Sequence, residues 1–150
     1  MTPTTEILIA NADGQRLLIR PLTRSHAGLF DSEDGNWIDC EIELDLGAFR
    51  GTFRADLRSE EFQTLMEQVE GLSLAPDGTA NFSTMEGQLA FTLTGDGREQ
   101  IRVGGEAIDA AGIGNRLQFA FIIERDALRE IARSLDNLLT AFPVVGSPAS

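Results

Sequence analysis

Lysine and tyrosine are absent from the sequence, and cysteine and histidine occur once each. Without lysine there is no Walker-type phosphate loop, so Gly104-Gly105 and Gly112-Ile113-Gly114 are interpreted as turn or bulge segments. One cysteine and one histidine do not supply the usual ligand set of a zinc site. A histidine-based triad would need His26, which lies in a polar loop, and the Gly-x-Ser-x-Gly motif does not occur. The residues therefore indicate no catalytic constellation, no metal site and no cofactor.

The lone Cys40 cannot form an internal disulfide, and its place between Ile38 and Ile42 predicts a buried, inert thiol. No stretch approaches the roughly 18 apolar residues of a membrane-spanning helix. Residues 1–6 carry no basic residue and no apolar core, so no secretory signal is expected. These observations favour the cytoplasm. All 12 basic residues are arginine, and since lysine and tyrosine codons are AT-rich, this composition suggests a GC-rich bacterial genome.

The net charge of −12 is the strongest compositional signal. Such a chain is repelled by nucleic-acid phosphates and anionic lipids, so neither is expected as a partner, whereas a basic protein is. Most of the charge lies in residues 31–70, which hold twelve acids and three arginines. The alternative is that the charge only supports solubility.

The segment Trp37 to Leu46 alternates between apolar and acidic residues with the period of a strand, so its acids share one face. These acids are Asp39, Glu41, Glu43 and Asp45. If Gly47-Ala48 is a two-residue turn to a second strand, Phe49 to Leu57, then Asp45 faces Arg50 and Glu41 faces Arg54. Such cross-strand pairs are a structural reason for the acids, and they compete with a binding role.

The remaining pattern predicts a hairpin near the N-terminus (Glu6 to Ala10 and Arg16 to Leu22), four later strands and two helices. The first helix is expected from Ser59, as N-cap, to Gly71, and Asp126 is expected to cap the second, which Pro143 ends. The later strands are expected at Thr79 to Thr84, Gln88 to Thr94, Glu99 to Ala107 and Arg116 to Glu124. We expect one α+β domain, ordered over about residues 6–146 with frayed ends. Its predicted core is a curved antiparallel sheet of about six to eight strands with both helices packed on one face.

Two acidic features of the sequence are candidates for a chemical site. The loop Asp31-Ser32-Glu33-Asp34-Gly35 is dense in oxygen ligands but lacks the spacing of an EF-hand, which favours a solvated loop. The strand acids lie about 6.7 Å apart at i and i+2, a spacing that suits a glycosidase pair. They are expected opposite arginines on an open face, however, and not in the apolar cleft that raises the pKa of a general acid.

Several segments, taken in order, are similar to the WapI-like bacterial immunity proteins and related small domains of unknown function. They are Asn36 to Ile42, Phe49 to Leu57, Glu86-Gly87-Gln88-Leu89, Asn115 to Phe119 and Ala141 to Val144. The similarity covers roughly residues 30–146, and Glu124-Arg125-Asp126-Ala127 departs from the Asp-Gln pair that often precedes the last helix in that family. The resemblance implies a protein that binds and neutralises a cognate toxin, commonly a nuclease, inside the producing cell.

The resulting hypothesis is a non-catalytic, antitoxin-type protein that occludes a basic toxin domain. Its predicted partner-binding residues are Trp37, Asp39, Glu41, Glu43, Asp45, Glu60, Glu67 and Glu70. Trp37 is interpreted either as an aromatic anchor or as a core residue at a strand end. The alternatives are a structural or regulatory accessory domain that self-associates through a sheet edge, and an enzyme of unrecognised type.

Overall fold

The computed structural model describes residues 4–146 and contains two antiparallel sheets of four strands each. The first, sheet A, has the strand order β1-β2-β3-β4. Its strands are β1 (Ile7–Ala10), β2 (Arg16–Arg24), β3 (Trp37–Leu46) and β4 (Phe49–Arg58). The predicted N-terminal hairpin and the β3–β4 register, in which Leu46 pairs with Phe49, are both confirmed. Gly47, with a φ of +85°, adopts the left-handed conformation that this two-residue turn requires.

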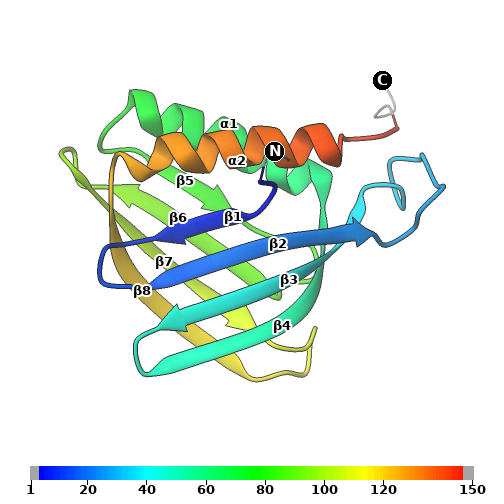
Figure 1. The fold of residues 1–150 in the computed structure, drawn as a ribbon, viewed down its shortest axis with the longest axis horizontal. Helices are drawn as coiled ribbons and strands as arrows, with labels where there is room; N and C mark the ends of the chain where they lie inside the picture. Colours follow the sequence, from blue (N-terminus) through cyan, green and yellow to red (C-terminus); the bar gives the residue numbers. More distant parts are fainter. Residues whose placement is uncertain (1–3, 147–150) are drawn as a thin grey trace.

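The second sheet, sheet B, repeats the same arrangement later in the chain. Its order is β5-β6-β7-β8, formed by β5 (Thr79–Phe82), β6 (Leu89–Gly95), β7 (Gln100–Ile108) and β8 (Arg116–Glu124). Each sheet is followed by one helix, α1 (Ser59–Leu74) after sheet A and α2 (Ala127–Ala141) after sheet B. The fold is therefore a four-stranded meander and a helix, formed twice (Figure 1).

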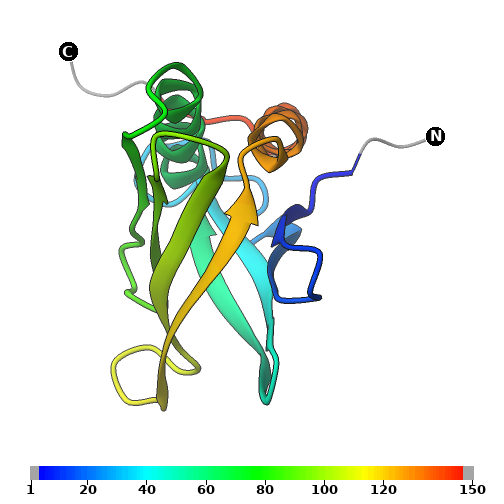
Figure 2. The ribbon, with the colours of Figure 1, turned by 90° about the vertical axis from the view of Figure 1, so that its left-hand side faces the viewer.

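The expectation of a single curved sheet is wrong, although the α+β class is confirmed. Sheets A and B face each other, and the two helices lie side by side at one end of them (Figure 2). Eight strands in one sheet would be about 38 Å wide, whereas α1 is about 24 Å long, so two helices leave much of an apolar sheet face uncovered. Packing the two apolar faces together covers both.

The core lies between the sheets and below the helices. Inward-facing strand residues such as Ile19, Ile42 and Leu93 are fully buried, as are Phe62 and Leu65 of α1. Aromatic rings join α1 to sheet B, where the centroids of Phe62 and Phe82 are 5.6 Å apart. The two halves therefore share one continuous core.

The start of α1 differs from the expectation. The N-cap is Arg58, one residue before Ser59, and the buried Ser59 hydroxyl has no hydrogen-bond partner among the described residues. The Glu61 carboxylate instead accepts a hydrogen bond from the Arg58 backbone N–H at 2.8 Å and another from the Met85 backbone N–H at 2.7 Å. Glu61 thus joins the helix start to the turn that precedes β6. For α2, Asp126 is the N-cap as expected, but its side chain makes no capping bond.

The C-terminal end of α1 has no basic residue in its own last turn, and a distant arginine supplies the missing donors. The helix runs to Leu74, beyond the expected Gly71. Arg125, from the segment between β8 and α2, donates to the backbone carbonyls of Leu72 at 2.7 Å and Ser73 at 3.1 Å. Because the last carbonyls of a helix lack partners within it, this contact stabilises α1 against α2.

Side-chain amides form hydrogen bonds with backbone groups of three edge strands. Asn11 donates to the Ile122 carbonyl of β8 at 2.9 Å, and Gln88 donates to the Arg54 carbonyl of β4 at 3.2 Å. At β5, Gln68 of α1 accepts a hydrogen bond from the Asn81 backbone N–H. Each amide comes from an element outside the sheet whose edge it contacts.

The N-terminal residues 1–3 and the tail 147–150, both expected to be frayed, lie outside the described residues. Within residues 4–146, neither α1 nor α2 is long and apolar enough to cross a bilayer.

Candidate functional site

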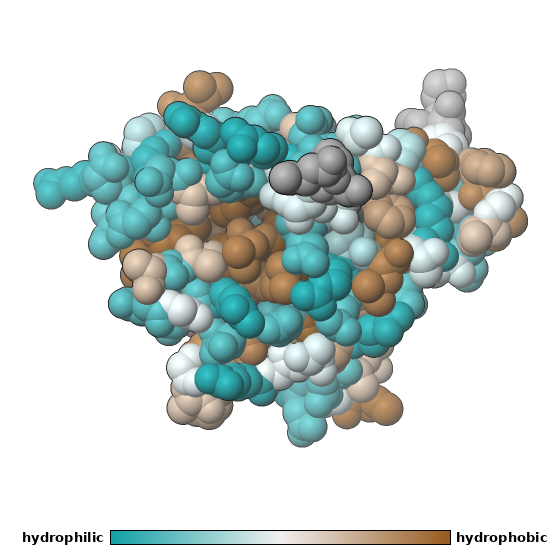
Figure 3. All heavy atoms as spheres, in the orientation of Figure 1, coloured by the Kyte–Doolittle hydropathy of each residue, from teal (hydrophilic) through white to brown (hydrophobic). Residues whose placement is uncertain are grey.

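The four strand acids lie where the alternation predicts, on the outer face of sheet A. Asp39, Glu41, Glu43 and Asp45 alternate with the buried Ile38, Cys40, Ile42 and Leu44 along β3. Their side chains are 25–31% exposed, so they lie at the surface while neighbouring side chains shield them in part. Figure 3, which views this face, shows hydrophilic residues over β2, β3 and β4 and hydrophobic surface nearer to α2.

Arginines from the two flanking strands contact each of these acids. From β2, Arg16 binds Glu43 at 2.7 Å, and Arg20 binds Glu41, which lies opposite it in the strand register. Arg20 also binds Glu6 at 2.9 Å, and this hydrogen bond is the main cause of its raised pKa.

The two arginines of β4 complete the network. The Nε of Arg54, at 3.1 Å, and its Nη2 both donate hydrogen bonds to the Asp39 carboxylate. This contact raises the pKa of Arg54. Arg50 pairs with Asp45 at 3.3 Å, as the register predicts. Arg54 faces Glu41 in the register but pairs diagonally with Asp39.

On the outer face of sheet A, each of the four acids of β3 therefore has an arginine partner, and Glu6 joins the network through Arg20. Surface pairs of this kind stabilise a protein by roughly 0–1 kcal/mol each. Their larger effect here is to neutralise the charge that the acids of β3 would otherwise present to a partner.

Negative charge without arginine partners lies on α1. Glu67 and Glu70 are exposed, and neither lies within 4.0 Å of an arginine nitrogen among residues 4–146. Glu60, also predicted as a binding residue, is half-buried and has the Arg58 guanidinium at 3.7 Å. Of the three predicted binding residues on α1, Glu60 therefore has an arginine beside it, whereas, within the described part of the chain, Glu67 and Glu70 do not.

The loop between β2 and β3 adds exposed acids near the start of β3. Asp31 accepts a hydrogen bond from the Asp34 backbone N–H at 2.9 Å, which is the main reason that its pKa is lowered. Glu33 and Asp34 point into solvent and form no ion pair within the described segment. No group of three metal-ligating side chains occurs in the loop or elsewhere in residues 4–146.

Trp37 connects this loop to the helix end. Its indole N–H donates to the Glu33 carbonyl at 3.1 Å, and the Arg58 guanidinium lies 5.8 Å from the ring centroid. The side chain is half-buried. It is therefore held rigidly while part of the ring stays at the surface, close to the unpaired acids of the loop.

Cys40 and His26 occupy the environments that the sequence suggests. Cys40 is fully buried, and this burial raises the pKa of its thiol far above the usual range, with Asp39 adding to the effect. His26 is exposed in the β2–β3 loop, where its backbone carbonyl accepts a hydrogen bond from the Leu29 N–H.

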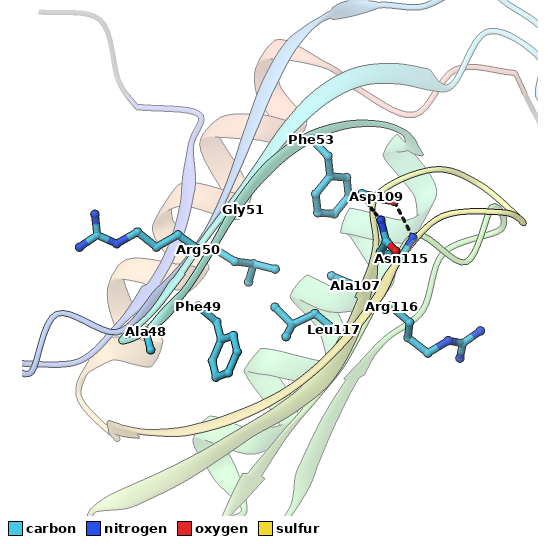
Figure 4. Close-up of a pocket in the computed structure, with 11 residues that line it drawn as sticks. Ala48, Phe49, Arg50, Gly51, Phe53, Ala107, Asp109, Asn115, Arg116 and Leu117 are labelled. Atoms are coloured by element: carbon cyan, nitrogen blue, oxygen red, sulfur yellow. Dashed lines mark hydrogen bonds between the residues drawn. The ribbon is translucent and has the colours of Figure 1, made fainter.

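A groove that the sequence did not predict opens at the end of the sheets opposite the helices. We call this end the mouth of the sandwich; its groove has a volume of about 320 Å³. Figure 4 shows Phe49 of β4 and Leu117 of β8 on its two sides, with Phe53 further along and Asp109 and Asn115 at its far end. The one sequence signal was Gly51, which takes an inward position on β4 where the neighbouring inward residues are phenylalanines.

Comparison with known proteins gives a family and a fold. No curated protein matches the sequence. A chain in the crystal structures of Trypanosoma bruciei MRP1/MRP2 is similar in structure, with a TM-score of 0.50 and 10% sequence identity, over 94% of this chain and 86% of that one. At this identity the similarity concerns the fold alone. The sequence model of the immunity protein WapI-like family matches residues 7–143, and the chain therefore belongs to the immunity protein WapI-like family.

Proposed function

We propose that this protein neutralises a toxin by binding a basic toxin domain in the cytoplasm of the cell that produces both, without catalysing a reaction itself. The family match supports the immunity role. The net charge of −12 supports a basic partner, since opposite charge accelerates and orients association. The groove at the mouth contains a single carboxylate, Asp109, which gives no support to a paired-acid hydrolase.

Among the predicted binding residues, the distribution of unpaired acids favours α1 over β3 as the docking surface. On β3, a basic partner would have to displace Arg16, Arg20, Arg50 and Arg54 before reaching Asp39, Glu41, Glu43 or Asp45. On α1, a basic partner can reach Glu67 and Glu70 without displacing any arginine of the described residues. We therefore assign the leading contacts to Glu67 and Glu70, with Glu60 beside them.

Trp37 and the β2–β3 loop form the second part of this docking surface. A rigidly held, partly exposed aromatic ring beside unpaired acids suits an anchor at the centre of an interface. The acids of β3 then serve a supporting role, because they hold β2, β3 and β4 in register beneath it.

The first step is to search the neighbouring genes for a large secreted protein with a basic C-terminal domain, and the isolated domain is then the partner in a binding test. The double variant Glu67→Arg/Glu70→Arg is compared with Glu130→Arg/Asp136→Arg on α2, which changes the net charge equally. We expect the α1 variant to bind at least about tenfold more weakly and the α2 variant to bind nearly normally. Binding of the unmodified protein should weaken as salt rises.

Three outcomes would contradict the proposal at different levels. Absence of binding and of protection from the toxin would remove the immunity role. Binding that ignores salt would remove the electrostatic part. Equal losses in both double variants would show that only the total charge matters and that α1 is not the docking surface.

A further inference from the structure

The groove at the mouth owes its volume to one missing side chain. Gly51 of β4 faces inward opposite Leu44 of β3, at a position between Phe49 and Phe53. A Cβ atom at Gly51 would meet no atom within 4 Å, so the space above it is empty. The walls of this space are mainly apolar, and they include Leu44, Ala107 and Leu117.

Two exposed apolar side chains lie at the same end of the molecule. Phe49, in the wall of the groove, is 65% exposed. Ile113 is 90% exposed in the loop between β7 and β8, whose two ends, Asp109 and Asn115, line the groove. A hole and a projecting side chain on the same face make that face complementary to itself, which is the requirement for a two-fold symmetric contact.

Charge at the mouth is more evenly balanced than over the whole chain. Arg50 pairs with Asp45 and Arg116 pairs with Glu106, and both arginines are well exposed, at 76% and 60%. Two molecules of net charge −12 repel each other least where arginines accompany the acids.

We propose that this protein forms a two-fold symmetric homodimer through the mouth, with Ile113 of each copy inserted into the groove beside Gly51 of the other. Phe49 of the receiving copy is covered in the contact. The interface is confined to one end of the molecule, which places it at the small end of specific interfaces and predicts a weak, concentration-dependent dimer. It leaves α1 and the β2–β3 loop free, so it stands apart from toxin binding.

The test is sedimentation velocity of the full chain over a wide concentration range, at low and high salt. The unmodified protein should shift from monomer to dimer as concentration rises, and salt should strengthen the dimer because it screens the repulsion. Toxin binding has the opposite salt dependence, so the two proposals fail independently.

Two variants and one control locate the contact. Gly51→Val fills the groove, and Ile113→Ser removes the inserted side chain from a surface position that does not affect folding; each should leave a monomer. Leu74→Ser removes an equally exposed apolar residue, 88% exposed at the other end of the molecule, and should remain dimeric. The proposal is overturned by a chain that stays monomeric throughout, by a dimer that survives Ile113→Ser, or by a dimer that Leu74→Ser also dissociates.

Discussion

Replacing Glu61 by alanine should be among the most damaging single changes to this fold. The Glu61 side chain is only 5% exposed, although it ends in a carboxyl group. It accepts hydrogen bonds from the backbone N–H groups of Arg58 and Met85 and contacts the Arg58 Nε at 3.3 Å. The truncation therefore leaves two backbone donors and a half-buried guanidinium without their acceptor.

The expected loss follows from these contacts. A hydrogen bond to a charged group contributes about 1.5–3 kcal/mol, so two such bonds predict a decrease of about 3–6 kcal/mol in the free energy of unfolding. That is a large part of the roughly 5–15 kcal/mol that stabilises a typical domain. Glu61→Gln, which keeps the shape and one acceptor oxygen, should lose about half as much.

Urea unfolding measures these losses, and the fluorescence of the sole tryptophan, Trp37, provides a local signal beside Arg58. Glu60→Ala is the matched control, because Glu60 is the preceding residue, its side chain is 37% exposed and its ion pair is long, at 3.7 Å. It should cost no more than about 1 kcal/mol. If Glu61→Ala costs no more than Glu60→Ala, the assigned role of the buried carboxylate is refuted.

Three further predictions concern other parts of the chain. Arg125→Met should lower the free energy of unfolding by about 1–3 kcal/mol, because the carbonyls at the end of α1 lose their donors, whereas the exposed Arg129→Met should change it little; equal urea midpoints would contradict this. Cys40 should not react with a thiol reagent at mildly alkaline pH until the protein unfolds, because burial raises the pKa of its thiol. Asp31 should titrate below the ordinary value of 3.8, since its lowered pKa means that the carboxylate stabilises the loop above that pH and loses this effect as the pH falls through the folded-state pKa. Carboxyl NMR signals of Asp31 follow this directly, and a titration at or above 3.8 would show that the bond to Asp34 does not persist in solution.

The strands and their neighbours could be predicted because alternation and turn chemistry are local. Trp37–Leu46 and Arg116–Glu124 have the predicted bounds, and Gly47-Ala48 determined the β3–β4 register. Division into two sheets could not be predicted in this way, because it depends on contacts between residues far apart in the sequence. The start of α1 was misplaced by one residue because Ser59 resembles a cap in sequence while the backbone of Arg58 and the side chain of Glu61 perform that role.

The sequence predicted which way the acids of β3 point, but it did not predict all of their arginine partners. The alternation placed the acids of β3 on the outer face, as observed. Their partners on β2 depend on a register that shifts between Pro21 and Thr23, which no local pattern reveals. The groove was missed because the alternation along Phe49 to Leu57 predicts only which face Gly51 takes, whereas its effect is the absence of a side chain.

The amides of Asn11, Gln68 and Gln88 have a consequence for the behaviour of this protein at high concentration. An edge strand with free backbone groups is a template on which another chain can polymerise as cross-β structure. Each of these amides occupies a backbone group that an incoming strand would need, and does so from an element that stays in place only while the molecule is folded. Resistance to fibril growth is thus coupled to native packing, and Gln88→Leu would leave the Arg54 carbonyl at the edge of β4 without this partner.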